Sequence, residues 1–384
     1  MLSCGEPSGD LYAGALTREL RRLDPAIDVS GLGGPQLAAA GGRLMADYRG
    51  LAVTGLTEAI GKLPRSFATI RRLVDAARAA RPDVLVTIDF PDFNFRLARR
   101  VKALGIPVVY YISPQIWAWR PGRLETIREI ADLVIVIFPF EEAIYRNAGV
   151  PVTFVGHPLV DLAKPSDKTD FLRCHGLSAA VPTIAVLPGS RPNEVRRILP
   201  DLVAAAELIR ARVPGAQVVV ARAPHLDDRL FDVARRPMPS RGQAVIIDGE
   251  TDAVLAAADV ALTASGTATV QTAIHDTPMV IVYRVSPLTY WLGRRLLTVD
   301  TFGMVNLIAG EKIVPELIQD GFTPDAVARE AVEMLTDRAR RTRVVEGLAL
   351  VRQRLGGPGA SRRAAEAILG LIEQRRGSGL GAEG

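Results

Sequence analysis

Five polar or glycine-containing motifs stand at the points where predicted strands end. The motifs are GEPSGD at residues 5–10, DFPDFN at 89–94, SPQIWAWR at 113–120, LPGSRPNE at 187–194 and ASGTAT at 264–269. Ligands of open parallel sheets bind beyond the carboxyl ends of the strands. These motifs are therefore the places at which we expect chemistry.

The two motifs in the second half of the chain predict an anion-binding site. Each follows an apolar strand and precedes a helix, so its backbone N–H groups and the helix dipole favour a bound phosphate. The residues concerned are Gly189, Ser190, Ser265, Gly266 and Thr267. Either motif alone is equally compatible with a tight turn before a capped helix. Two of them in one half of the chain favour a nucleotide diphosphate.

The sequence argues against the commonest nucleotide-binding motifs. It contains no G-x-x-x-x-G-K-[ST], and GLGGPQ at 31–36 is a poor match to G-x-G-x-x-G. ATP hydrolysis and NAD binding therefore lose support, and we expect no cofactor. Arg191 follows Gly189 and Ser190 directly and offers a fork-shaped cation to a departing diphosphate. The alternative for Arg191 is an ordinary surface arginine.

Asp89 is the candidate general base. It ends a buried apolar strand, where apolar neighbours favour uptake of a proton from an attacking hydroxyl. The alternative is a helix-capping motif, in which Asp92 or Asn94 caps the following helix, and we assign that role to Asp92. His157, in the motif VGHP, lies near a predicted domain junction. It either forms a hydrogen bond across the cleft or is a buried structural histidine.

Aromatic and basic residues raise the question of a membrane contact. We expect Trp117 in the core or in the wall of a cleft. Residues 56–74 combine an apolar helical stripe with basic neighbours, which suits a membrane surface or a core-facing helix. The apolar set is Leu56, Ile60, Leu63, Phe67, Ile70 and Val74, and the basic set is Lys62, Arg65, Arg71 and Arg72. Residues 291–297 repeat this pattern.

Length and composition limit the classes of protein to consider. A chain of 384 residues is expected to form two or three domains. Its 47 basic and 42 acidic residues are nearly balanced, which is not typical of nucleic-acid binding. Cys4 and Cys174 form neither a disulfide framework nor a zinc-ligand pattern, so no metal is expected. Because no apolar run could span a bilayer, we expect a protein of the cytoplasm or of a membrane surface.

Eight continuously apolar runs are typical of parallel strands buried on both faces. They lie at 83–89, 106–113, 132–138, 183–189, 216–221, 244–248, 259–264 and 278–283. Helical patterns at 66–81 and 199–213 indicate a β-α-β order, and hence a doubly wound α/β fold. We expect domains at 1–165 and 166–350, then at 351–384 a helix, which can pack back on the first domain, and a disordered tail formed by RRGSGLGAEG at 375–384. The first strand is only a stub, or the natural start lies upstream.

The motifs together resemble those of lipid-A-disaccharide synthases. The matching segments, in the family's order, are GEPSGD, GLGGPQL, IDFPDFN, YISPQIWAWR, IFPFE, FVGHPLVD, LPGSR-x-x-E, ASGTAT, PMVIVYR and VPELIQ. The resemblance implies the GT-B fold, in which two Rossmann-like domains face a cleft. It also implies an inverting transfer from UDP-2,3-diacylglucosamine to 2,3-diacylglucosamine 1-phosphate (lipid X), which forms the β-1,6-linked lipid A precursor and UDP.

The resemblance also implies roles for individual residues and partners. The donor nucleotide would bind the second domain, and the acceptor would lie over the first, near Gly9, Asp10 and the base Asp89. Further residues expected to bind the substrates are Ser8, Asn94, Trp117, His157, Glu194 and Gln271. Helix dipoles and Arg191 would replace a metal. The protein would act on the cytoplasmic face of the inner membrane, and a homodimer is compatible with the family.

Gln271 is a departure from the family pattern. The family usually has Glu at this position, where a carboxylate can accept hydrogen bonds from both ribose hydroxyls. From the sequence we expect Gln271→Glu to bind UDP more tightly, by up to about 1 kcal/mol. Two other interpretations stay open: another GT-B enzyme that uses a UDP-sugar, and a non-catalytic peripheral membrane protein.

Overall fold

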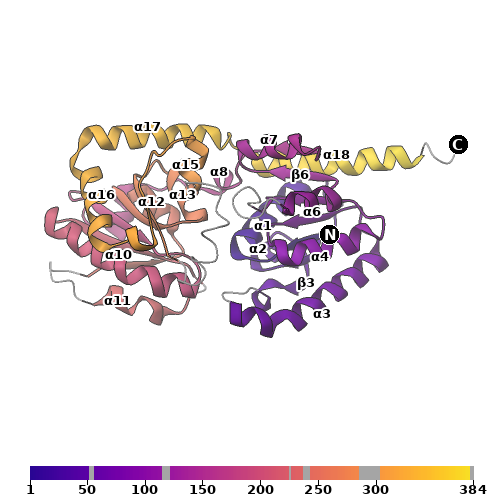
Figure 1. Cartoon of the computed structure of the whole chain (residues 1–384), viewed down its shortest axis with the longest axis horizontal. Coiled ribbons are helices and arrows are strands. Elements are labelled where there is room, and N and C mark those ends of the chain that lie inside the picture. Colours follow the sequence, from indigo (N-terminus) through magenta and orange to yellow (C-terminus); the bar gives the residue numbers. More distant parts are fainter. Residues whose placement is uncertain (52–55, 115–121, 225, 237–242, 285–302, 381–384) are drawn as a thin grey trace. The chain divides into compact units, whose positions relative to one another are not determined.

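The computed structural model describes residues 1–51, 56–114, 122–224, 226–236, 243–284 and 303–380. The chain divides into two compact units (Figure 1). Unit 1 comprises Met1–Asp161 and Leu355–Gly384, and unit 2 comprises Leu162–Arg354. Each unit contains its own parallel sheet, so each is described separately.

Unit 1 is built on a seven-stranded parallel sheet in the order β3-β2-β1-β4-β5-β6-β7. The strands are β1 Leu2–Cys4, β2 Ser30–Gly33, β3 Arg43–Asp47, β4 Leu85–Ile88, β5 Val108–Tyr111, β6 Leu133–Val136 and β7 Val152–Phe154. Strands β1, β4 and β5 are buried along their whole length, as expected of strands covered by helices on both faces.

Helices cover this sheet, and two of them begin within the motifs at 5–10 and 89–94. They are α1 Pro7–Leu23, α2 Pro35–Ala39, α3 Leu56–Ala80, α4 Pro91–Lys102, α6 Arg123–Ile130, α7 Pro139–Asn147, α8 Leu159–Leu162 and α18 Ala360–Leu380. Helix α18, yellow in Figure 1, packs against α1. The Asp161 carboxylate caps α18 by accepting hydrogen bonds from the N–H groups of Gly359 and Ser361, at 2.5 and 3.0 Å.

The C-terminal helix extends further than the sequence indicated. Residues 375–380 were assigned to the tail, but α18 continues to Leu380. The guanidinium groups of Arg375 and Arg376 form ion pairs with Asp132 and Asp83, which hold the end of the helix against the sheet. These partners lie more than 200 residues away in the sequence, so local composition could not reveal them.

Unit 2 contains a six-stranded parallel sheet in the order β10-β9-β8-β11-β12-β13. The strands are β8 Thr183–Leu187, β9 Gln217–Arg222, β10 Val245–Asp248, β11 Val260–Ala264, β12 Met279–Tyr283 and β13 Glu316–Ile318. The helices are α9 Lys168–Cys174, α10 Pro192–Arg212, α11 Asp232–Arg235, α12 Thr251–Ala257, α13 Thr267–Ile274, α15 Met304–Ala309, α16 Pro324–Thr336 and α17 Arg338–Arg354. All eight predicted apolar runs are strands, and the doubly wound fold class is confirmed.

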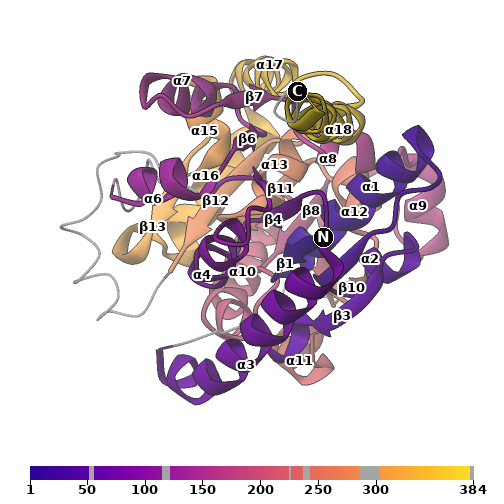
Figure 2. The same cartoon turned by 90° about the vertical axis from the view of Figure 1, so that its right-hand side faces the viewer.

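The predicted apolar stripe on α3 is buried at one end and exposed at the other. Ile70 and Val74 belong to the hydrophobic core of unit 1. Leu63 and Phe67, about two turns and one turn nearer the start of the helix than Ile70, are exposed to 39% and 44%. Figure 2 shows α3 beside α4, and the Arg96 guanidinium carbon of α4 lies 5.3 Å from the centre of the Phe67 ring.

Candidate functional site

The two predicted phosphate loops are neighbours at one edge of the unit 2 sheet. Strands β8 and β11 pair in parallel, with Leu187 opposite Thr263, so the loops after them leave the sheet side by side. The chain then turns in opposite directions, toward β9 and β10 after β8 and toward β12 and β13 after β11. Such a reversal of strand order is where doubly wound sheets bind nucleotides.

The loop after β8 is held by a capping interaction. Gly189 has a φ of 113°, and a Cβ at this position would lie 2.6 Å from the Glu194 carboxylate. That carboxylate accepts a hydrogen bond from the Arg191 N–H at 3.3 Å and from its guanidinium at 3.2 Å. Glu194 thus fixes the loop, while Ser190 and the Arg191 side chain, which is 48% exposed, remain at the surface.

The loop after β11 presents the start of α13. The Ser265 N–H donates to the carbonyl oxygen of Val282 at 2.8 Å, so it is used within the sheet. Gly266 has φ 144° and ψ −159°, a conformation open essentially to glycine alone. Thr267, the exposed first residue of α13, begins the turn whose N–H groups have no partner inside the helix. The amide of Gln271 instead donates to Asp252 Oδ1 at 2.8 Å.

In unit 1, Asp89 occupies a strained turn directly after β4. Both Asp89 and Phe90 have positive φ, 43° and 50°, which is costly for residues with a Cβ. The Asp89 carbonyl oxygen accepts hydrogen bonds from the Tyr110 hydroxyl at 2.9 Å and from Asn94 Nδ2 at 2.7 Å. Burial raises the pKa values of the Tyr12 and Tyr110 hydroxyls, and the nearby Asp89 charge raises them further.

Asn94 is fully buried and its polar atoms are engaged. Its Oδ1 accepts a hydrogen bond from the Ser3 hydroxyl at 2.6 Å, and its Nδ2 donates to the Asp89 carbonyl. The helix cap expected at Asp92 is absent: residue 90 is the N-cap, without a side-chain bond, and Asp92 pairs with Arg123 at 2.8 Å. The sequence prediction for Asp92 was therefore wrong, because α4 begins at Pro91 and Asp92 lies inside its first turn.

The GEPSGD segment packs beside the Asp89 turn. A Cβ at Gly5 would lie 2.1 Å from the Phe90 ring, and a Cβ at Gly9 would lie 3.3 Å from that of Cys4. Ser8 is partly exposed in the first turn of α1. Asp10 is only 1% exposed, and its carboxylate accepts hydrogen bonds from main-chain N–H groups at the start of α2. The donors are Gly34 at 2.7 Å, Gln36 at 2.9 Å and Leu37 at 3.1 Å.

Replacing Asp10 by Ala is expected to destabilise unit 1 by about 3 kcal/mol, because it leaves buried N–H groups without acceptors. Chemical denaturation of the full chain, followed by far-ultraviolet circular dichroism, would measure the loss. Asp28→Ala is the control, since Asp28 is 74% exposed and should cost at most about 0.5 kcal/mol. Equal stability of the two variants would show that the Asp10 hydrogen bonds do not support the fold.

His157 is buried within unit 1, where it is 2% exposed. Its Nδ1 accepts a hydrogen bond from the Leu159 N–H at 3.1 Å, and its ring packs against Tyr12 and Phe138. Burial lowers the pKa of His157 to about 3, so the ring is neutral at physiological pH. Trp117, the other aromatic candidate, lies outside the described residues, as does the basic segment at 291–297.

The comparisons with known proteins agree over nearly the whole chain. The family model described as lipid-A-disaccharide synthetase matches residues 1–368. The chain belongs to the lipid-A-disaccharide synthetase family. A lipid-A-disaccharide synthase of Myxococcus xanthus is 44% identical over 377 residues, covering 98% of each chain. One from Geobacter metallireducens is 41% identical over 380 residues, again covering 98% of each.

Solved structures show the same fold at low identity. UDP-GlcNAc 2-epimerase from Neisseria meningitidis bound to UDP-GlcNAc has a TM-score of 0.67 at 12% identity, covering 96% of this chain and 98% of that one. The calicheamicin glycosyltransferase CalG4 has a TM-score of 0.57 at 18% identity, covering 96% of each. The GT-B fold predicted for a lipid-A-disaccharide synthetase is therefore confirmed.

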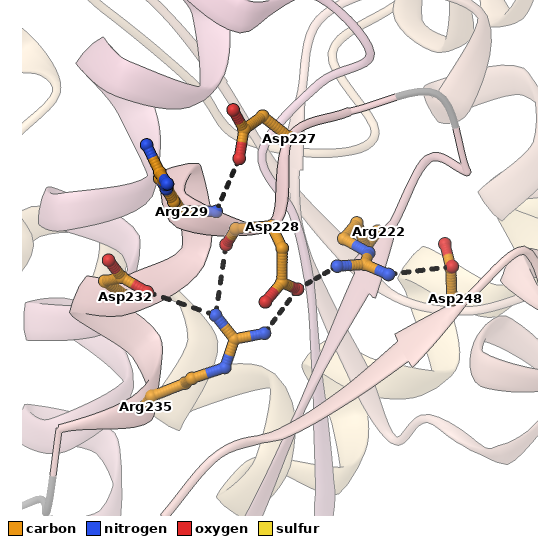
Figure 3. Close-up of polar contacts among 7 residues, drawn as sticks. All are labelled: Arg222, Asp227, Asp228, Arg229, Asp232, Arg235 and Asp248. Atoms are coloured by element: carbon orange, nitrogen blue, oxygen red, sulfur yellow. Dashed lines mark hydrogen bonds and ion pairs between the residues drawn. The ribbon is translucent and has the colours of Figure 1, made fainter.

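Unit 2 also contains a charged cluster whose residues lie outside the five strand-end motifs. Arg222 and Asp248 end the paired strands β9 and β10, and their side chains meet at 2.8 Å. Asp228 joins Arg222 to Arg235 (Figure 3). The network links two strand ends at the edge that carries the two predicted phosphate loops. Its sequence signal was one charged residue at the end of each apolar run.

Within the part of the chain that the structure describes, no group of three or more His, Cys, Asp or Glu side chains is arranged to hold a metal ion. None of the helices found in those residues has both the length and the apolar character that crossing a bilayer requires.

Proposed function

We propose that this chain transfers 2,3-diacylglucosamine from its UDP derivative to lipid X, forming the β-1,6-linked disaccharide 1-phosphate and UDP. The observation that carries the proposal is the full-length family match, because it covers both units and all five strand-end motifs. The 6-hydroxyl oxygen of lipid X attacks the anomeric carbon of the donor and inverts it. The bond to UDP breaks, and the diphosphate leaves with the electron pair.

We assign the donor nucleotide to the edge of unit 2. Arg191 stabilises the charge that grows on the diphosphate, together with the N–H groups that begin α13. Gly189, Ser190, Ser265, Gly266 and Thr267 shape the two loops, and Glu194 holds the first of them. Support comes from the adjacency of the loops and from the exposed guanidinium of Arg191.

We assign the acceptor side to unit 1, with Asp89 as the base that takes the proton of the attacking hydroxyl. Support comes from its strained turn, since backbone strain of this kind clusters at active sites. Ser8 and Gly9 border the same turn. Asp10, Asn94 and His157 are buried and bonded within unit 1, so we propose that they support the site without touching substrate. Trp117 remains a candidate for the substrate-binding surface.

Acylation of the donor distinguishes this function from that of another GT-B enzyme. Turnover should require UDP-2,3-diacylglucosamine and should be at least about a hundredfold lower with unacylated UDP-glucosamine, because the acyl chains supply binding energy. Comparable rates with the two donors would favour a different UDP-sugar enzyme. Absence of UDP release from either donor would favour a non-catalytic protein.

We also propose that the chain binds the cytoplasmic face of the inner membrane through an α3–α4 surface. We define this surface as Leu63 and Phe67 with the exposed arginines Arg71 and Arg96. Leu63, Phe67 and Arg71 are spaced by four residues and so share one face of α3. Exposed large apolar side chains beside arginines suit an anionic lipid surface, which would also place the enzyme next to its acylated substrates.

Replacing both Leu63 and Phe67 by Ser is expected to weaken binding to vesicles of anionic phospholipid by about tenfold or more, through lost apolar burial. Vesicle co-sedimentation measures this, and calorimetry should find the UDP affinity unchanged. Leu44→Ser is the matched control, because Leu44 on β3 is 36% exposed and lies outside the α3–α4 surface. Equal vesicle binding by the native chain, the double variant and Leu44→Ser would contradict the assignment of this surface.

A further inference from the structure

Three side chains of unit 2 form a hydrogen-bonded group beside the second phosphate loop. Asp252 lies in the first turn of α12, and Gln271 and His275 lie one turn apart at the end of α13. Asp252 Oδ1 is 2.8 Å from Gln271 Nε2 and 2.9 Å from His275 Nε2. Asp252 is 19% exposed and His275 is 11% exposed, so solvent competes little for these contacts.

The group fixes which way the Gln271 amide faces. Burial alone would raise the pKa of Asp252, but hydrogen bonds from His275 and Gln271 outweigh it and lower the pKa. Asp252 is therefore an ionised carboxylate, which only accepts hydrogen bonds. Asp252 must therefore accept hydrogen bonds from the NH₂ group of Gln271 and from the N–H of His275. The carbonyl oxygen of Gln271 consequently points away from Asp252 and can accept a hydrogen bond from a ligand.

The direction of that oxygen follows from helix geometry. Side chains in an α-helix lean toward its N-terminus, and residues four apart share one face. Gln271 therefore leans toward Thr267, the exposed residue at the start of α13. His275 lies on the same face one turn below. The amide thus lies between the partly buried charge of Asp252 and the loop assigned to the donor diphosphate.

We propose that Asp252, held by His275, is a positioning residue that directs the carbonyl oxygen of Gln271 toward the ribose hydroxyls of the donor nucleotide. The inference rests on the proposed UDP-sugar function. It assigns the negative charge at this site to Asp252 instead of residue 271. Gln271 then supplies one acceptor, and Asp252 determines that this acceptor, and not the NH₂ group, meets the ribose.

This arrangement reverses the effect expected for Gln271→Glu from the sequence. A carboxylate at 271 would face the Asp252 carboxylate at hydrogen-bond distance, and like charges repel. We expect Gln271→Glu to weaken UDP binding by about fivefold. Adding Asp252→Asn should restore binding to within about twofold of the native chain, because the new amide can donate to the new carboxylate.

The direct test is calorimetric titration of the full chain with UDP and with 2′,3′-dideoxy-UDP, which lacks both ribose hydroxyls. The native chain should bind UDP about fivefold or more tightly than the analogue, the value of one or two net hydrogen bonds. Asp252→Ala should bind the two nucleotides about equally and keep the native affinity for the analogue, which also shows that it is folded. Asp325→Ala, which removes a 79% exposed carboxylate of α16, should leave the preference unchanged.

The outcomes separate this inference from the proposed function. Failure of the native chain to bind UDP would contradict the UDP-sugar function itself. Native binding of UDP, with the same preference over the dideoxy analogue in Asp252→Ala, would overturn the positioning role and leave that function standing. Failure of the Asp252→Asn, Gln271→Glu pair to bind better than Gln271→Glu alone would also overturn the positioning role.

Discussion

Replacing Asp89 by Asn is expected to lower turnover by about a hundredfold or more and to leave the affinity for UDP unchanged. Asn has the shape of Asp but cannot take a proton from the attacking hydroxyl. The fold should tolerate the change, because Asn also adopts positive φ readily. Moreover, the hydrogen bonds from Tyr110 and Asn94 reach the main-chain carbonyl of residue 89, which is retained.

Steady-state kinetics with UDP-2,3-diacylglucosamine and lipid X measures the turnover, and calorimetry measures UDP binding. Asp92→Asn is the matched control from the same turn. Its carboxylate is 81% exposed and pairs with Arg123, so its loss should change turnover by less than about threefold. Near-native turnover in Asp89→Asn would remove Asp89 from the mechanism.

Replacing Arg191 by Ala is expected to lower turnover by about two to three orders of magnitude, with a smaller loss of UDP affinity. Charge on the diphosphate grows as the bond to the sugar breaks, so the guanidinium stabilises the transition state more than the bound donor. The loop should keep its conformation, because Glu194 accepts its cap hydrogen bond from the main-chain N–H of residue 191.

Two comparisons make this expectation specific. Arg191→Lys should recover only part of the lost turnover, since an ammonium group keeps the charge but not the forked geometry. Arg196→Ala should behave as the native chain, because Arg196 is an exposed residue of the next turn of α10 and contacts Asn193. Equal losses of turnover and of ground-state UDP binding in Arg191→Ala would mean that Arg191 binds the donor without favouring the transition state.

The sequence predicted most of the inner strands, because their apolar runs reflect burial on both faces. It did not predict β2, β3, β7 or β13, which have three to five residues and lack such a run. Strands β3, β7 and β13 lie at sheet edges, where one side has no neighbouring strand and continuous apolar character is not required.

The sequence indicated where the candidate site residues lie, at the ends of strands, but not what each side chain does there. Asp10, Asn94 and His157 lie in motifs that suggest chemistry, yet each is buried and bonded to main-chain groups or to another side chain. Their partners include Gly34 and Ser3, 24 and 91 residues away, and no local pattern indicates such contacts. Gln271 is a similar case, since Asp252 precedes it by 19 residues on a different helix.

UDP release from UDP-2,3-diacylglucosamine, measured with and without lipid X, tests the proposed glycosyl transfer most directly. We expect release only when lipid X is present, with one disaccharide 1-phosphate formed for each UDP. The dependence arises because the acceptor hydroxyl, not water, attacks the anomeric carbon. UDP release at the same rate without lipid X, or no release when both substrates are present, would contradict the transfer.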